Sequence, residues 1–153
     1  MNNITFARNL VKGRIVETIF AQMLRETGNF TVLELGYEKI IPELVQQKEY
    51  GDIVETLRTA PDFVVINKTT KVVQLIEVKY KKVLNFDYVL ENAQRMSQSW
   101  NPSYLFIATL DGFYFDEISD VIRNNGQIFP LDDSQISKEL QNEYLKILVD
   151  FER

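Results

Sequence analysis

Residues 61–80 have the sequence PDFVVINKTTKVVQLIEVKY, and this stretch decides the fold that we expect. Two apolar runs rich in β-branched residues, Asp62–Asn67 and Val72–Tyr80, flank a polar Lys-Thr-Thr-Lys segment, which predicts a β-hairpin. If Thr69 and Thr70 form a two-residue turn, the two strands pair symmetrically about it. The register of the hairpin then follows from the sequence.

This register brings charge into an apolar hairpin. Asp62 falls opposite Glu77, and Lys79 emerges on the same face because side chains alternate along a strand. Opposed Cβ atoms lie about 5 Å apart, and like charges placed so are destabilising. A divalent cation between the carboxylates would offset the repulsion. The alternative is that Glu77 and Lys79 form a solvent-facing half strand, but apolar neighbours on both faces favour a site.

The segment before the hairpin predicts a helix with a carboxylate in its apolar stripe. Residues 4–27 carry apolar positions at helical spacing. Gly13 costs such a helix about 1 kcal/mol relative to alanine and permits close approach to another backbone. Glu17, one turn later, either supports the site or pairs with Arg14 or Lys12. The stripe consists of Phe6, Leu10, Gly13, Glu17, Phe20 and Leu24.

The other segments predict an α/β chain. No linker or repeat divides it, so we expect one domain over residues 1–153. Its fold class is α/β, with a mixed central β-sheet flanked by α-helices over about residues 4–110 and an acidic helical extension over 111–153. Residues 42–59 are ambiguous. Beyond the hairpin and the first helix we expect strands at Phe30–Glu38 and Tyr104–Leu110, and helices at 86–99 and Ser134–Phe151.

Composition limits the chemistry. The chain has no cysteine and no histidine, which excludes disulfides, thiolate metal sites, Ser-His arrangements and the usual zinc ligand. Hydrolysis would therefore depend on carboxylates, lysine and a hard ion such as Mg²⁺ or Mn²⁺. The N-terminal residues include no uninterrupted apolar stretch that could act as a signal or membrane span. We expect a cytoplasmic protein without a membrane partner.

The charge distribution is uneven. The net charge of −5 opposes binding to nucleic acid, which depends on Lys and Arg. Basic residues nevertheless gather at 1–25 and 68–95, whereas acidic residues dominate after 110. Local charge matters more than the sum for binding, so we expect a basic working face and an acidic far side.

Together these residues resemble a known motif. Pro61-Asp62 followed by Glu77-Val78-Lys79 resembles the signature of the PD-(D/E)xK nuclease superfamily, which includes restriction endonucleases and Holliday-junction resolvases. Glu17 resembles the additional acidic residue that many members carry on the first helix. The family's restriction-endonuclease-like core, a helix, a hairpin bearing the motif, a helix and a further strand, matches the elements expected over residues 4–110.

The resemblance implies a metal-dependent deoxyribonuclease, acting in a structure-directed or nonspecific way. Asp62 and Glu77 would bind Mg²⁺ with the Val78 carbonyl as a further ligand, and Glu17 would hold a second metal or its water. Lys79 would orient or deprotonate the attacking water. The side chains that we expect to contact DNA are Arg14, Lys81, Lys82, Gln94 and Arg95.

Two other readings remain open. The chain could be a catalytically inactive nuclease-fold module that binds DNA or a protein, although the intact Asp62, Glu77 and Lys79 argue against it. The acidic region after residue 110 could dock a protein partner, or its apolar positions could simply be core. By analogy with enzymes that cut both strands of a duplex, we expect a homodimer.

Overall fold

The computed structural model describes residues 2–35, 56 and 59–152, so most of the ambiguous segment 42–59 and the end of the strand expected at 30–38 lie outside the described residues. A mixed five-stranded sheet has helices on both faces, which confirms the expected α/β class. The elements in chain order are α1 (Asn3–Thr27), β1 (Phe30–Glu34), β2 (Phe63–Asn67), β3 (Val73–Tyr80), α5 (Phe86–Ser97), β4 (Tyr104–Ala108), β5 (Phe113–Glu117), α6 (Ile118–Arg123) and α7 (Lys138–Glu152).

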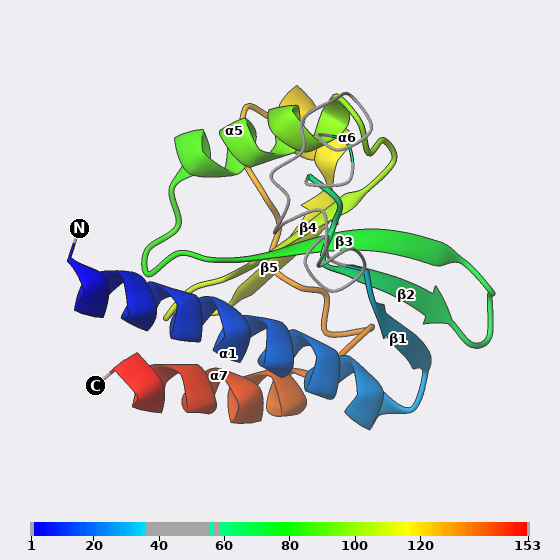
Figure 1. Ribbon diagram of the computed structural model, residues 1–153. Coiled ribbons are helices and arrows are strands. Elements are labelled where there is room, and N and C mark those ends of the chain that lie inside the picture. Colours follow the sequence, from blue (N-terminus) through cyan, green and yellow to red (C-terminus); the bar gives the residue numbers. More distant parts are fainter. Residues whose placement is uncertain (1, 36–55, 57–58, 153) are drawn as a thin grey trace.

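The sheet separates two helical layers, as Figure 1 shows. Its strand order is β1-β2-β3-β4-β5, antiparallel throughout except for the parallel pair β3 and β4, which α5 connects. The helices α1 and α7 lie side by side on one face, and α5 and α6 lie on the other. Two apolar clusters fill the layers, one around Phe20, Phe63 and Phe106 and one around Ala93 and Leu105.

The hairpin has the expected register but a wider turn. Phe63 pairs with Ile76 and Val64 with Leu75, as the sequence predicts. The two-residue turn is wrong, because four residues, 68–71, separate the Asn67 and Val72 ends. The side chain of Asn67 accepts the N–H groups of the two turn threonines, and Lys71 adopts a left-handed φ of 64°. The wider turn takes one extra residue from the end of each strand, so the pairing of the remaining residues is unchanged.

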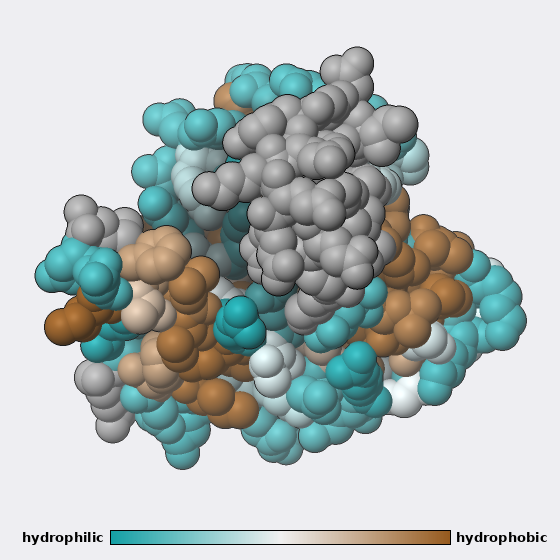
Figure 2. All heavy atoms as spheres, in the orientation of Figure 1, coloured by the Kyte–Doolittle hydropathy of each residue, from teal (hydrophilic) through white to brown (hydrophobic). Residues whose placement is uncertain are grey.

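The helix α1 is buried only in its second half. Phe20 and Leu24 are buried as the stripe predicts, but Phe6 and Leu10 are 57% and 50% exposed. The first turns of α1 carry apolar side chains into solvent, where they form the brown patch beside the N-terminal end of the helix in Figure 2. Gly13 does not serve a close approach, because a Cβ there would meet no described heavy atom within 4 Å.

Residues 111–153 are not a purely helical extension. β5 pairs with β4 and completes the sheet, and α6 packs against α5, so both belong to the core. The strand was missed because Phe113–Glu117 is short and ends in two acidic residues. The last helix begins at Lys138 rather than Ser134, because the N–H of Ser134 donates to Asp132 in a preceding turn. Among the described helices, none has the length and apolar character needed to cross a membrane.

Candidate active site

Asp62 lies where β2 and β3 stop pairing. The strand ladder ends at the Phe63 and Ile76 pair, and Asp62 directly precedes it. The carbonyl of Asp62 accepts the N–H of Leu35 at 2.8 Å, which fixes its main chain against the end of β1. Its carboxylate Oδ2 accepts the N–H of Val78, also at 2.8 Å. A side chain therefore takes the backbone donor that the ladder leaves free, and the carboxylate is held against β3.

Glu77 lies beside Asp62 and is buried, with 8% of its surface exposed. Burial first, then the charge of Glu77 and a hydrogen bond to its carboxyl, raise the pKa of Asp62 to about 8. The Val78 N–H and the Lys79 ammonium oppose this rise without cancelling it. The two acids thus repel each other in a poorly solvated site, as expected for carboxylates that share one position.

Lys79 joins this pair to a cleft. Its Nζ lies 3.7 Å from Oε2 of Glu77, and its side chain is half-buried. The same side chain lines a cleft of about 520 Å³ between β3 and α5. Because alternate residues of β3 face opposite layers, Glu77 and Lys79 face α5, whereas Ile76 and Val78 pack with the α1 layer. The predicted Asp62, Glu77 and Lys79 therefore do come together.

The oxygen atoms of Asp62 and Glu77 suit a divalent cation such as Mg²⁺ or Mn²⁺. Both side chains offer carboxylate oxygens, which these ions prefer, and the repulsion between them is what a cation relieves. The carbonyl of Val78 points toward the same strand edge as its N–H, which meets Asp62, because both groups of an extended residue face one neighbour. Val78 could therefore add a third oxygen.

Glu17 lies on α1, the helix that covers the sheet face opposite α5. Within residues 2–35, 56 and 59–152, no group of three or more His, Cys, Asp or Glu is arranged to hold a metal. Glu17 is half-buried on the turn of α1 that precedes Phe20. Phe20 packs on Phe63 of β2, with ring centroids 5.1 Å apart, so this part of α1 covers the sheet face opposite the Lys79 side chain. A metal-binding role for Glu17 stays a prediction.

The five side chains expected to contact DNA divide between the layers. Gln94 and Arg95 line the same cleft as Lys79. The ammonium of Lys81 lies over the ring of Tyr88 on α5, 4.6 Å from its centroid. Lys82 instead lies near Glu152 on the α7 side, where its charge helps to lower the pKa of that carboxyl. Arg14 is exposed on α1, on the same far side of the sheet as Lys82.

Two groups of side chains were missed from the sequence. Asn92 is buried on α5 and contacts Arg95, and its signal was an amide among the apolar residues of that helix face. At the end of β3, the O–H of Tyr80 donates to Glu152, which also pairs with Lys12 of α1. These three residues are far apart in the sequence, so no local pattern could have joined them.

The acidic region after residue 110 forms a separate cleft of about 680 Å³. Tyr104 and Phe115 stack in its wall, with ring centroids 5.5 Å apart. The cleft lies at the β5 edge and gathers several of the carboxylates that follow residue 110. Its carboxylates belong to Asp116, Glu117, Asp120, Asp132 and Asp133.

No protein-family model matches the sequence, and no curated protein matches it with significance. In structure, the chain is similar to Hjc, a Holliday junction resolvase from the archaeal hyperthermophile Archaeoglobus fulgidus, solved at 1.6 Å resolution. The two are 14% identical, the TM-score is 0.41, and the match covers 86% of this chain and 98% of that chain. At this level the likeness concerns the fold alone, and the candidate site depends on the contacts described above.

Proposed function

We propose that this chain is a metal-dependent deoxyribonuclease that hydrolyses DNA phosphodiester bonds in a structure-directed or nonspecific way. The observation that supports it best is the hydrogen bond from the Val78 N–H to Asp62, which holds one carboxylate against the buried Glu77. A pair of acids beside a lysine that lines an open cleft is the arrangement that this chemistry requires.

Asp62, Glu77 and the carbonyl of Val78 would hold Mg²⁺ or Mn²⁺. When bound, the ion would supply positive charge to the scissile phosphate and lower the pKa of water. The ammonium of Lys79 lies near Glu77 and also lines the cleft, so it would approach the phosphate from the cleft. There it orients the attacking water and stabilises the charge that develops on the phosphate as the phosphorus–oxygen bond to the leaving strand breaks.

A second candidate function is a catalytically inactive module of the same fold that binds DNA or a protein. The finding that favours it is the absence, among the described residues, of a third acid grouped with Asp62 and Glu77. Such a module would gain no thermal stability from Mg²⁺ or Mn²⁺. The acidic cleft at the β5 edge would then be the surface to test for a protein partner.

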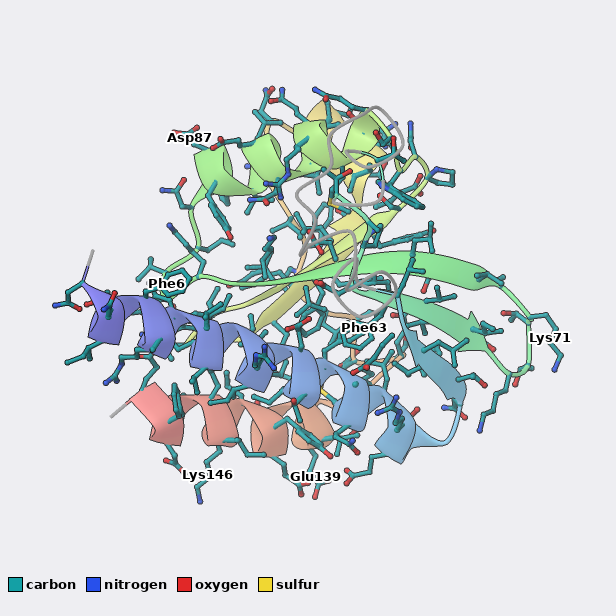
Figure 3. All side chains as sticks on the ribbon, in the orientation of Figure 1. Phe6, Phe63, Lys71, Asp87, Glu139 and Lys146 are labelled. Atoms are coloured by element: carbon teal, nitrogen blue, oxygen red, sulfur yellow. The ribbon has the colours of Figure 1, made fainter. Side chains whose placement is uncertain are left out.

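The test is cleavage of labelled duplex, junction, flap and single-stranded DNA, with RNA alongside, in Mg²⁺ or Mn²⁺. The native chain is compared with Asp62→Ala and Lys79→Ala. Matched controls are Asp87→Asn and Lys146→Met, which change the same charges on α5 and α7, at the periphery of the molecule in Figure 3. Light scattering on the same samples tests the homodimer that we expect.

We expect cutting by the native chain and both controls, and none by folded Asp62→Ala or Lys79→Ala. If the native chain cuts nothing and the metals do not stabilise it, the nuclease proposal is wrong and the inactive module is favoured. If the site variants cut as fast as the native chain, the activity belongs to other residues.

A further inference from the structure

Asn92 is a buried amide in an otherwise apolar helix face. It is 6% exposed, and its neighbours on the inner face of α5 are Val89, Ala93 and Met96, all fully buried. A buried amide costs free energy unless its hydrogen bonds are made. Its Nδ2 donates to the carbonyl of Tyr88 at 2.8 Å, which leaves its Oδ1 to face outward from the helix.

That outward oxygen holds an exposed arginine. Nη2 of Arg95 donates to Oδ1 of Asn92 at 2.8 Å. An exposed arginine ordinarily samples many rotamers, and fixing it has an entropic cost. A guanidinium has five N–H donors in a planar fork, so one bond to Asn92 leaves the others available for an anion. The contact therefore orients the arginine without using its binding capacity.

Arg95 and Lys79 lie in the same cleft between β3 and α5. The two side chains line one cleft, and Tyr88 and Asn92 form part of its wall. The ammonium of Lys81 lies over the ring of Tyr88, one of the lining residues, and so adds positive charge beside the cleft. One carboxylate, that of Glu91, opposes them among the described lining residues. The excess of positive charge fits a phosphate group better than a neutral or cationic ligand.

We propose that the cleft between β3 and α5 is a phosphate-binding subsite for the nucleic-acid backbone next to the scissile group, and that Asn92 is the residue that positions Arg95 in it. The inference rests on the proposed nuclease function and deepens it. Lys79 is shared between the acid pair and the cleft, so a strand that reaches the acids passes Arg95. Asn92 acts only through the arginine.

The test uses Asn92→Leu, Arg95→Ala and the double variant. Leucine keeps the branching of asparagine at Cγ and suits the apolar neighbours of position 92, although it is larger, and it removes the oxygen. Melting curves of each variant check that the fold is kept. The matched control is Arg123→Ala, which removes an exposed arginine from α6 outside the cleft. For each chain, the DNA dissociation constant is measured against salt concentration, and kcat and KM against substrate.

Removal of the arginine should weaken DNA binding about tenfold and reduce the salt slope by about one. Asn92→Leu should raise KM about threefold to tenfold with a smaller change in kcat, and should cause no further loss in the Arg95→Ala background. Arg123→Ala should bind as the native chain does.

The inference is overturned if Asn92→Leu leaves KM and the salt slope unchanged while the native chain cuts DNA. It is overturned equally if the losses from Asn92→Leu and Arg95→Ala simply add, because Asn92 would then act independently of the arginine. Failure of the proposed function looks different: the native chain itself would neither bind DNA in a salt-dependent way nor cut it.

Discussion

Two glutamates lie on opposite sides of β3, Glu77 within the strand and Glu152 on α7, and their surroundings differ in electrostatic character. On the α7 side, Glu152 accepts from Lys12 at 2.8 Å and from the Tyr80 O–H at 2.7 Å. These bonds, that from Lys12 first, hold the pKa of Glu152 below its usual range. On the α5 side, the buried Glu77 faces the half-buried Asp62, whose pKa rises to about 8.

The two sites show the difference between a charge that stabilises the fold and a charge that serves a function. Glu152 is compensated, so its negative charge ties α7 to α1 and to the end of β3. The pair of Asp62 and Glu77 has one ammonium at 3.7 Å and remains undercompensated, so it destabilises the fold in the absence of a cation. Groups with such pKa shifts next to a cleft mark functional sites more often than structural ones.

The largest expected effect is the difference in cleavage rate between variants of Lys79 and Lys12. Lys79→Met should reduce DNA cleavage by about a hundredfold or more, since the charge beside the phosphate is lost, while in Mg²⁺ the melting temperature falls less than in Lys12→Met, because the ion compensates the acid pair. Lys12→Met should lower the melting temperature more and leave the cleavage rate intact. Rates and melting curves of both variants check this, and equal loss of cleavage in the two would break the comparison.

A metal-free chain should be stabilised by Asp62→Asn at pH 8. The asparagine still accepts from Val78, but the repulsion with Glu77 is gone. One pKa unit corresponds to about 1.4 kcal/mol, so the gain is on the order of a few kcal/mol.

The way in which the stability of the native chain changes with pH follows from the raised pKa of Asp62. Well below pH 3.8 the folded and unfolded chains both hold the Asp62 proton, so the native chain loses nothing there. Its stability falls as the pH rises toward about 8, whereas that of the variant does not. Urea unfolding at several pH values in chelator measures the difference, and a gap that is constant from pH 4 to 8 would contradict the account.

Glu152→Gln should destabilise the chain at neutral pH by about 1–3 kcal/mol, since a charged acceptor of two hydrogen bonds is lost. The pKa of this group is lowered in the fold, so the stabilisation is present above the ordinary value of 4.5 and is lost as the pH falls below it. Cleavage should be unchanged. Urea unfolding at pH 7 and pH 3 provides the check, and an undiminished difference at pH 3 would point to packing instead.

The smallest expected effect concerns the α1 layer. Gly13→Ala should stabilise the chain by about 0.5–1 kcal/mol, because alanine is the better helix former and no described atom obstructs its Cβ. The cleavage rate should not change. Melting curves of the variant and the native chain measure this, and a loss of stability would mean that the position is more crowded than it looks.

The site was predictable where its residues share one hairpin. The strand pairing of Asp62–Asn67 with Val72–Tyr80 needs only alternation and symmetry, so it held even though the turn is wider than expected. The buried half of α1 was predictable from helical spacing. The exposure of Phe6 was not, because spacing shows which side chains share a face and not how far the sheet beneath extends.

The rest depends on contacts between distant segments. The strand Phe113–Glu117 joins the sheet only because β4 offers a free edge, a feature absent from its own sequence. Glu152 finds its two partners on α1 and β3 through tertiary packing alone. Asn92 could have been noticed as a polar residue among apolar ones, but its contact with Arg95 required the helix to be placed.

Calorimetric titration with Mn²⁺ at pH 7 tests the central claim most directly, because it reports on the acid pair without requiring the right DNA substrate. The native chain and Glu152→Gln should bind the ion alike, and Asp62→Asn should bind it at least tenfold more weakly. Equal binding by Asp62→Asn and the native chain, or no binding by the native chain, would contradict the assignment of Asp62 and Glu77 as a metal site.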